Sequence, residues 1–598
     1  MDTRTAPQTK TTRAPEGVRG REGDALEANA VTAARAALTF LAVLLVYWPA
    51  RQFAFLNFDD DEYVTDNPFV ATGLSKPNVL AAFSRHRGGH YHPLTWLSHM
   101  ADVSLFGMAP GPAHLVNVVI HALTTALLFW LVARCLRAPW FAMFVALFFG
   151  LHPLRIESVA WIAERKDVLS LFFALATLHA WVSYTRRPRV GWYLTVVICF
   201  VLGLLSKPTL VTLPALLLLF DEWPLGRRNR GVSARRRLYE QLPLAALSLA
   251  SVLITTLSQR SEGALAASSA SGWPLVSERV ATAAVAYLAY LGKLFWPVGL
   301  GIFYPLRPYP PGVGAGACVA LAGLTWLCLG PRRQRPEGPA VAFAWAWFML
   351  APLPIIGLVQ FGGQAFANRW TYLCHLGLIL GLASAVRDRL APRARSALGV
   401  AAVLACALWT RHELPHWRTS ESIFRHTLAV SPDNFMAHTN LGNALDAAGN
   451  LDEAATHYEE AARLNPTYPE ALNNLGTLQA RRNQMTEAAA TFARALAIRP
   501  DMPLARYNLG LADSHLGRPV EAATEWLTLL GRVPDHPLAR HSLAFVAERA
   551  LAPACAAYTL SAPPAIAAAF FEALSRWRPV PDDAGLAQTL ANLTACLR

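Results

Sequence analysis

Eleven apolar segments joined by short linkers fill the first two thirds of the chain. They cover residues 36–50, 113–134, 139–152, 168–184, 191–205, 209–220, 242–258, 315–330, 339–357, 372–386 and 396–411. Lipid offers the backbone no hydrogen-bond partners, so a chain that crosses a bilayer must form helices or a closed barrel. The segments are continuously apolar rather than alternating, which favours helices. The sequence therefore predicts an all-α fold with a polytopic membrane domain over residues 36–411.

The distribution of charge gives this domain an orientation. Of the 598 residues, 54% are hydrophobic and 16% are charged, with a formal net charge of +13. Arginines gather between the apolar segments, as at 227–237 and 332–335, and short Arg-rich loops mark the cytoplasmic face. The positive charge thus reflects membrane topology, and we expect no nucleic-acid partner. Residues 1–35 are expected to form a disordered cytoplasmic tail, with no cleaved signal peptide.

This topology places three longer loops on the non-cytoplasmic side, at residues 51–112, 152–167 and 259–314. An apolar stretch in the last of these, residues 280–303, would move the arginines at 332–335 outside if it crossed the membrane. We therefore expect it to lie in the membrane plane or to re-enter. Eleven crossings also leave the C-terminal region outside.

A repeat of 34 residues occupies the C-terminal region. The recurring residues include Pro432, Pro466, Pro500 and Pro534, the Leu-Gly pairs at 441, 475 and 509, and Tyr458, Phe492 and Trp526. This pattern is typical of tetratricopeptide repeats, in which each unit is a pair of helices. We predict repeats at 432–465, 466–499 and 500–533 in an α-solenoid over 412–540, with a degenerate helical cap over 541–598. The solenoid is either a spacer or a groove that binds a polypeptide.

The cysteines leave the compartment open. Six of the eight lie in or beside apolar segments and lack the spacing of a metal site. The other two, Cys555 and Cys596, either pair in an oxidising compartment or remain separate thiols.

Four consecutive acidic residues, at positions 59–62, follow the first apolar segment. A charge at the centre of a bilayer costs about 2.5–3.5 kcal/mol, so this cluster lies in water or in a polar cavity. Asp59 and Asp60, directly after the span, are the stronger candidates for a functional role. Asp61 and Glu62 suit a solvated turn equally well.

The second outer loop is short and dense in both signs of charge. It carries Glu157, Arg165 and Asp167 between apolar segments. Ionisable groups within a membrane domain usually mark a functional site, although a salt-bridge network that only orders the loop is the alternative. If the stretch from Arg155 is helical, Glu157 and Glu164 share one face.

Two further cations, Lys207 and Arg369, stand at the same membrane face. Carboxylates opposite cations suit sugar transfer from a lipid-linked phosphate, because a carboxylate can take the proton of the acceptor hydroxyl while a cation stabilises the leaving phosphate. A divalent metal, Mg²⁺ or Mn²⁺, held by Asp59 and Asp60 would serve the same end. The His-x-His at residues 90–92 is a weaker metal signal, against ordinary loop packing.

Several motifs resemble those of the transmembrane and tetratricopeptide-repeat-containing O-mannosyltransferases, a family of the GT-C glycosyltransferase superfamily. They are Phe58-Asp59-Asp60, Tyr91-His92-Pro93-Leu94-Thr95, His114-Leu115-Val116-Asn117 with His121-Ala122-Leu123, and the stretch from His152-Pro153 to Arg165-Lys166-Asp167-Val168-Leu169-Ser170. The order of the two parts is similar as well. The resemblance covers most of residues 36–540 and implies a GT-C-like membrane domain.

The resemblance implies an inverting transfer of mannose, or a related sugar, from a polyprenyl-phosphate carrier to Ser or Thr of a protein. The implied catalytic residues are Asp59, Asp60, Glu157 and Asp167, and the implied lipid-phosphate ligands are Arg165, Lys207 and Arg369. The match at Lys207 is partial, because Pro208 stands where we expect an acidic residue.

The short outer loops and small repeat array favour a bacterial inner-membrane protein, with undecaprenyl phosphate as carrier and an acceptor protein bound by periplasmic repeats. Two alternatives remain open. In the first, the sugar goes to a lipid or an envelope polysaccharide, and residues 432–598 are dispensable for transfer. In the second, the chain is a non-catalytic membrane-anchored scaffold, and replacing Asp59 or Asp60 by Asn changes no activity.

Overall fold

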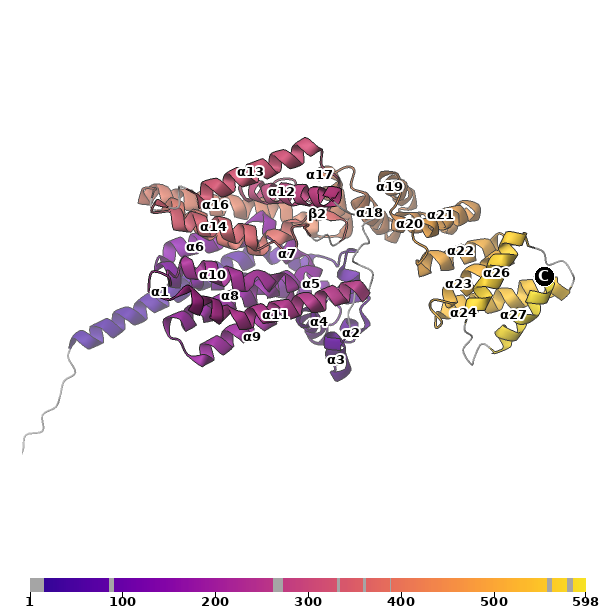
Figure 1. Ribbon diagram of the computed structural model, residues 1–598, viewed down its shortest axis with the longest axis horizontal. Helices are drawn as coiled ribbons and strands as arrows, with labels where there is room; N and C mark the ends of the chain where they lie inside the picture. The colour runs from indigo at the N-terminus through magenta and orange to yellow at the C-terminus, as the bar shows by residue number, and fades with distance from the viewer. Residues whose placement is uncertain are drawn as a thin grey trace, which may run out of the picture. The chain divides into compact units, whose positions relative to one another are not determined.

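The computed structural model describes residues 16–84, 91–261, 273–330, 334–358, 362–387, 389–556, 562–577 and 584–597. Within these ranges the chain is helical apart from one two-stranded sheet (Figure 1). It divides into two compact units, Met1–Ser422 and Ile423–Arg598, whereas the sequence placed the boundary near residue 411. The predicted all-α class, with a helical membrane domain followed by repeats, is confirmed.

The first unit consists mainly of apolar helices. They are α1 (Glu16–Tyr47), α2 (Pro68–Ala71), α3 (Lys76–Ser84), α4 (Pro93–Phe106), α5 (Pro110–Leu136), α6 (Pro139–Gly150), α7 (Ile156–Ala160), α8 (Arg165–Arg186), α9 (Val190–Ser206), α10 (Leu213–Glu222), α11 (Ala234–Ser261), α12 (Trp273–Phe295), α13 (Pro311–Leu329), α14 (Gly338–Leu350), α15 (Thr371–Arg387) and α16 (Pro392–Glu413). Each of the eleven predicted apolar segments coincides with helix over most of its length. The protein is an integral membrane protein.

The described part of the chain has fewer helices that meet the length and apolarity of a membrane span than the eleven crossings that the sequence predicts. Among the described residues, seven helices are long and apolar enough to cross, or eight if α6 and α7 form one broken span. Helices α9 and α14 are apolar but shorter, at 17 and 13 residues, which is less than the about 20 residues that a straight crossing needs. The count of eleven therefore stays a prediction.

Two predicted segments differ in the structure. The tail expected to be disordered over 1–35 is helical from Glu16 onward, because α1 continues the first span toward the N-terminus; residues 1–15 lie outside the described residues. The stretch 280–303 is helical only as far as Phe295, where α12 ends. Its placement in the membrane plane stays a prediction.

Helices α5 and α8 organise the first unit. Helix α5 packs against α1, α6 and α8, and α8 packs against α9 along most of its length (Figure 1). The N-terminal end of α8 carries Arg165, Lys166 and Asp167, all buried. The charged start of α8 is therefore enclosed by neighbouring helices. Its three ionisable side chains are held in the interior, where they can contribute to a functional site.

Helix α15 is held close to α14 by two glycines four residues apart. A Cβ on Gly377 would overlap the ring of Trp347, and one on Gly381 would lie 2.5 Å from the carbonyl oxygen of Ala340. Small residues at this spacing let helices approach closely in membranes. This close packing of α15 on α14 fixes the position of α15, which begins two residues after Arg369.

The segment that carries Arg369 is also held by the small sheet. Strand β1 (Tyr304–Pro305) pairs antiparallel with β2 (Gln364–Phe366), and the rings of Tyr304 and Phe366 stack with centroids 4.3 Å apart. Asn368 then donates to the carbonyl oxygen of Gly301 over 3.0 Å. These contacts leave Arg369 little freedom of position.

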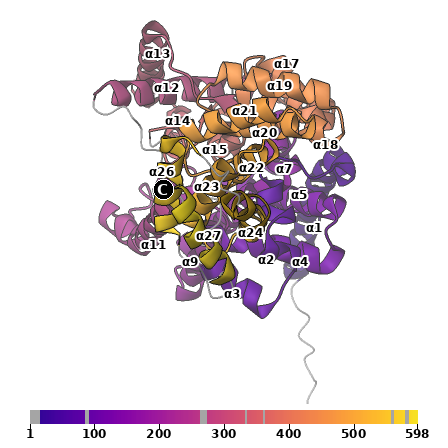
Figure 2. The same cartoon turned by 90° about the vertical axis from the view of Figure 1, so that its right-hand side faces the viewer.

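The second unit is a solenoid of helix pairs (Figure 2). The pairs are α18 (Phe435–Ala447) with α19 (Leu451–Leu464), α20 (Pro469–Arg481) with α21 (Met485–Ile498), and α22 (Pro503–His515) with α23 (Pro519–Leu530), flanked by α17 (Ser420–Val430), α24 (Pro537–Val546), α25 (Ala552–Ala556), α26 (Pro564–Arg576) and α27 (Ala584–Leu597). The 34-residue period thus corresponds to one pair of helices per repeat, as predicted.

Close contact between a glycine and a ring explains why these two residue types recur together. A Cβ on Gly442 would lie 2.5 Å from the ring of Tyr458, and one on Gly476 would lie 2.8 Å from the ring of Phe492. Both rings are buried, at 2% and 1% exposure. Only glycine leaves room for the aromatic residue that fills the interior of each pair.

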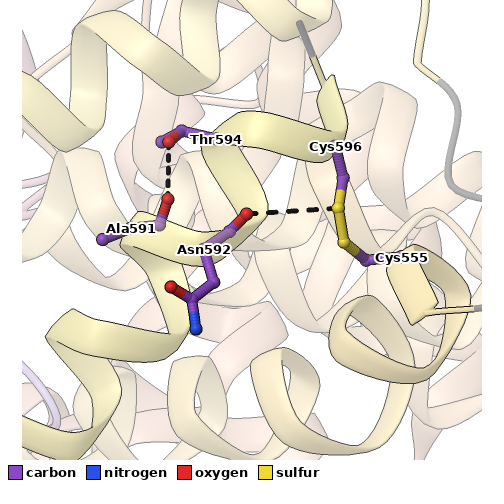
Figure 3. Close-up of a disulfide and its surroundings, with 5 residues drawn as sticks. All are labelled: Cys555, Ala591, Asn592, Thr594 and Cys596. Atoms are coloured by element: carbon purple, nitrogen blue, oxygen red, sulfur yellow. Dashed lines mark hydrogen bonds between the residues drawn. A yellow bond between two sulfur atoms is a disulfide. The ribbon is translucent and has the colours of Figure 1, made fainter.

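The cap at the C-terminus is closed by a disulfide. Cys555, in α25, is bonded to Cys596, in α27 (Figure 3). Between them, Phe570 of α26 is fully buried in the apolar core that joins the last repeat to the cap. The two cysteines therefore pair, and of the two alternatives left by the sequence the structure has the disulfide.

We predict that Gly476→Ala lowers the stability of the repeats by about 1–3 kcal/mol, the usual cost of overpacking a core. Gly585→Ala is the matched control, because a Cβ there meets nothing within 4 Å. The midpoints of thermal unfolding of the full-length variants in detergent measure the difference. Equal midpoints for both variants would contradict the role of the glycine–ring contact.

Candidate active site

The stretch between α6 and α8, predicted as an outer loop over 152–167, is instead buried along its whole length. Helix α7 is bent by 56° from α6, with Pro153 at the first position after the bend. The ring of His152 bonds to the carbonyl oxygen of Leu294 over 3.0 Å and to the backbone N–H of Leu154 over 3.3 Å. The segment therefore re-enters the core, where its charges must be satisfied by other protein groups.

The stretch from Arg155 is not one continuous helix. Trp161 has extended backbone (φ −92°, ψ 121°) and separates α7 from the turn Ile162–Glu164. Glu157 and Glu164 nevertheless face the same cation, because Arg369 bonds Glu157 through Nη1 over 2.5 Å and Glu164 through Nε over 3.1 Å. The break changes the path of the backbone but keeps the two carboxylates together.

Glu164 is the centre of a buried charge cluster. One of its oxygens lies 3.0 Å from Lys166 Nζ, and the other lies 3.2 Å from Lys207 Nζ. With Arg369, three cations surround this carboxylate, whose side chain is 1% exposed. Burying a carboxylate costs free energy because it loses its hydration, and the three ion pairs offset this cost.

The other two carboxylates complete the cluster. Asp167 bonds Lys207 Nζ over 2.6 Å and accepts a hydrogen bond from the hydroxyl of Ser158 over 3.1 Å. Glu157 uses one oxygen for Arg369, while its Oε2 is buried without a partner among the described residues. The cluster of Glu157, Glu164, Asp167, Lys166, Lys207 and Arg369 thus balances three carboxylates with three cations.

A small cleft of about 30 Å³ opens onto this cluster. Three of the predicted site residues line it: Asp167, Lys207 and Arg369. The rest of the lining is mainly apolar and consists of Ser170, Leu171, Thr209, Leu210, Ala351, Ile355, Trp370, Tyr372 and Leu373. The cleft therefore has a charged end and an apolar wall.

Asp60 is a structural clamp. Its side chain is fully buried, and its two oxygens accept hydrogen bonds from the backbone N–H of Leu56 (2.8 Å) and of Ala163 (2.7 Å). Burial raises the pKa of Asp60 to about 8, although these two hydrogen bonds lower it. Asp60 joins the first loop to the turn that carries Glu164. The structure therefore gives it a positioning role rather than the role of base that the sequence left open.

Asp59 is not part of this clamp. Its φ of 63° puts it in the left-handed region, which Asp adopts more readily than most residues. The side chain is half-buried, and among the described residues no hydrogen bond or ion pair engages its carboxylate. Burial raises its pKa, while the nearby charges of Lys166 and Arg369 oppose the rise. A free, raised carboxylate beside the cluster has the properties of a general base.

The metal site predicted at Asp59 and Asp60 stays a prediction. Asp60 is buried and already accepts two backbone hydrogen bonds, so Asp59 and Asp60 do not present a pair of free oxygens. Within the described ranges, no group of three or more metal-ligating side chains includes either residue. Residue 90 of the His-x-His lies outside the described residues. His92 is buried, and its ring contacts the hydroxyl of Tyr63 over 3.2 Å.

Arg165 belongs to a separate network. Its guanidinium is 0% exposed and bonds Asp102 over 2.6 Å, Ser98 over 2.8 Å, the carbonyl oxygen of Ala113 over 2.8 Å, and Asn117. None of these partners belongs to the cluster around Glu164. Arg165 ties α8 to α4 and α5, and the structure does not bring it to the cleft as a phosphate ligand.

Sequence reasoning therefore missed three residues and misplaced one. Glu164 and Lys166 stood in the charged stretch but were not chosen, although their position among apolar residues was a usable signal. Asp102, the partner of Arg165, lies on another helix. The residues around Asp102 in the sequence give no sign that it forms an ion pair.

Family models match both units of the chain. A model of dolichyl-phosphate-mannose-protein mannosyltransferases matches residues 94–256. A tetratricopeptide-repeat model matches residues 416–469, 439–503 and 473–537. The chain is thus similar to mannosyltransferases in its membrane unit, including Glu164, Asp167 and Lys207, and has tetratricopeptide repeats in the second unit.

Individual relatives carry the same combination. The chain is 27% identical over 505 residues to the human protein O-mannosyl-transferase TMTC1, covering 74% of this chain and 56% of that protein. It is 35% identical over 144 residues to human TMTC2, covering 23% and 17%. The chain therefore spans little more than half the length of TMTC1. The resemblance predicted from the motifs is confirmed.

One solved structure aligns over most of the chain. ArnT from Cupriavidus metallidurans, bound to undecaprenyl phosphate, shares 14% identity and a TM-score of 0.34, over 92% of this chain and 90% of that one. A TM-score at this level does not establish a common fold.

We predict that Asp60→Asn destabilises the protein by about 1–3 kcal/mol, because the amide offers one acceptor where two backbone N–H groups need partners. Asp59→Asn, the neighbouring control, is expected to leave stability within about 0.5 kcal/mol. Thermal unfolding of the purified variants in detergent separates the two. A larger loss for Asp59→Asn would contradict the role of Asp60 as the carboxylate that holds the two backbone N–H groups.

Proposed function

We propose that the protein is a membrane glycosyltransferase that moves a sugar, taken to be mannose, from a polyprenyl-phosphate carrier to a Ser or Thr hydroxyl of a protein. The observation that carries the proposal is the cleft with Asp167, Lys207 and Arg369 at its charged end and apolar side chains along its wall. Similarity to O-mannosyltransferases over 74% of the chain supports the reaction class.

The donor phosphate binds at the charged end of this small cleft, which opens further to admit it. Among the described residues, Arg369 uses Nε for Glu164, Nη1 for Glu157 and Nη2 for Gln364, which leaves one N–H on each Nη. Lys207 uses two of its three N–H groups. These remaining donors can bind phosphate oxygens without breaking the cluster. The isoprenoid chain then lies against the apolar wall.

The reaction is a single displacement at the anomeric carbon. The acceptor hydroxyl loses its proton to the carboxylate of Asp59 while its oxygen forms a bond to the anomeric carbon from the face opposite the leaving group. The bond between that carbon and the phosphate oxygen breaks, and polyprenyl phosphate leaves with the electron pair. Lys207 and Arg369 stabilise the charge on the departing phosphate. The configuration at the anomeric carbon is inverted.

The second unit supplies the acceptor. Amide side chains recur along the repeats: Asn474 donates to Asn443 over 2.7 Å and Asn508 donates to the hydroxyl of Thr477 over 3.3 Å. Partly buried amides of this kind can bind a polypeptide backbone. The disulfide between Cys555 and Cys596 supports a non-cytoplasmic location for this unit, in the periplasm of a bacterium, because disulfides persist in oxidising compartments.

We predict that Asp59→Asn lowers transfer from a radiolabelled polyprenyl-phosphate sugar to a periplasmic protein extract by about 10²–10⁴-fold, the usual contribution of a general base. Because the base acts when deprotonated, wild-type activity is expected to rise with pH through a pKa above the ordinary range of Asp. Initial rates across pH measure both effects. Equal rates for wild type and Asp59→Asn would contradict the assignment and favour a non-catalytic scaffold.

We predict that Lys207→Gln raises the KM for the donor by about 10–100-fold, since a charged hydrogen bond to the phosphate contributes about 1.5–3 kcal/mol. Lys76→Gln, at the exposed start of α3, is the matched control with the same change of charge. Donor titrations at a fixed acceptor concentration give the two constants. An unchanged KM in Lys207→Gln would contradict phosphate binding at the charged end of the cleft.

A further inference from the structure

A second cleft lies at the other end of α8. Its volume is about 520 Å³, and its lining consists of Tyr184, Tyr193, Ser233, Arg235, Arg236, Tyr239, Glu240 and Pro243. These residues come from the end of α8, the start of α9, and the segment from Ser233 into α11, and α9 packs against both of the other helices (Figure 1). Because Asp167 is at the first turn of α8 and Tyr184 at the last, the two clefts stand at opposite ends of one helix of 22 residues.

The floor of this cleft is an ordered polar network. Glu240 binds Arg227 over 2.7 Å and Arg236 over 3.3 Å, and it accepts hydrogen bonds from the hydroxyl of Tyr184 over 3.1 Å. The hydroxyl of Tyr193 donates to the backbone oxygen of Glu240 over 2.7 Å. The one carboxylate in the lining is therefore neutralised by protein cations and does not repel an anion.

Positive charge exceeds negative charge around the cleft. Residues 221–240 contain six arginines and three acidic residues. Arg228, Arg230 and Arg235 are exposed, and among the described residues none of the three forms an ion pair. Arg235 lies 5.3 Å from the centre of the Tyr239 ring and donates from Nε to the Tyr239 hydroxyl over 3.1 Å. Both of its Nη groups stay available for an anion.

Apolar side chains stand exposed next to this charge. Leu238 and Leu242 of α11 are 55% and 57% exposed, and Leu194 of α9 is 53% exposed. Helix α11 is one of the helices long and apolar enough to cross a membrane, so its exposed leucines are available to contact lipid. An anion that occupies the cleft therefore has apolar surface beside it, on which acyl chains can lie.

We propose that this cleft binds the headgroup of an anionic phospholipid, with Arg235 and Arg236 on the phosphate and the acyl chains along α9 and α11. Charge complementarity selects an anion, and the adjoining apolar surface selects a lipid over a free ion. The site is independent of the sugar-transfer cleft, since no residue is shared between the two linings.

The test uses the full-length protein in a neutral detergent, titrated with dioctanoyl phosphatidylglycerol and followed by native mass spectrometry. The variant R235Q/R236Q is compared with R393Q/R395Q, which removes the same charge at the start of α16, away from the cleft. We expect R235Q/R236Q to weaken phosphatidylglycerol binding by about ten-fold or more, and R393Q/R395Q by less than about two-fold. Dioctanoyl phosphatidylcholine is expected to bind all three proteins alike.

Three results would overturn the proposal. The first is an equal loss of phosphatidylglycerol affinity in the two double variants, and the second is equal binding of the two lipids to wild type. The third is inorganic phosphate that competes as strongly as phosphatidylglycerol, which would indicate a site for a free anion. The single variant R235E guards against misfolding, because Arg235 forms no ion pair whose loss would destabilise the protein. A photoactivatable phosphatidylglycerol that labels peptides of α11 in wild type and not in R235E gives an independent readout.

Discussion

The arrangement of the membrane unit depends on the ion pairs of one buried carboxylate, that of Glu164. Lys166, Lys207 and Arg369 converge on it from α8, from the end of α9 and from the segment before α15. Removing any one charge from such a group leaves another unpaired in a medium of low dielectric, which costs about 3–5 kcal/mol. The same contacts that hold three segments together also place their polar atoms at the head of one cleft.

The two acidic residues of the first loop differ in their roles. Asp60 holds backbone in place near the cluster, and Asp59 is the base that we propose. Asp60 binds the backbone of Ala163, one residue before Glu164, and so couples the first loop to the cluster. Asp59 has a left-handed backbone, and its half-buried carboxylate is close enough to Lys166 and Arg369 to be affected by their charges. A carboxylate held by two backbone N–H groups and the carboxylate that we propose as the base are thus adjacent in sequence.

The parts of this structure that could be predicted from sequence are those that periodicity determines. The helices follow from long apolar segments, and the repeats follow from the recurrence of Gly with an aromatic ring. Pairing between distant charges carries no such signature. The resemblance implied Arg165 as a phosphate ligand, and its ion pair with Asp102 on another helix could not be foreseen; Glu164 was not chosen. The difference between Asp59 and Asp60 lies in the two backbone hydrogen bonds of Asp60, which residue types alone do not reveal.

The most direct measurement is a structure of the protein with a bound polyprenyl phosphate. We expect the phosphate to lie within hydrogen-bond distance of Lys207 Nζ and of the Nη atoms of Arg369, with the isoprenoid chain against Leu171, Leu210 and Leu373. We also expect the carboxylate of Asp59 to face the side of the phosphate from which an acceptor approaches. A phosphate bound elsewhere, with the cleft between α8 and α15 unfilled, would contradict the assignment of this cleft as the donor site.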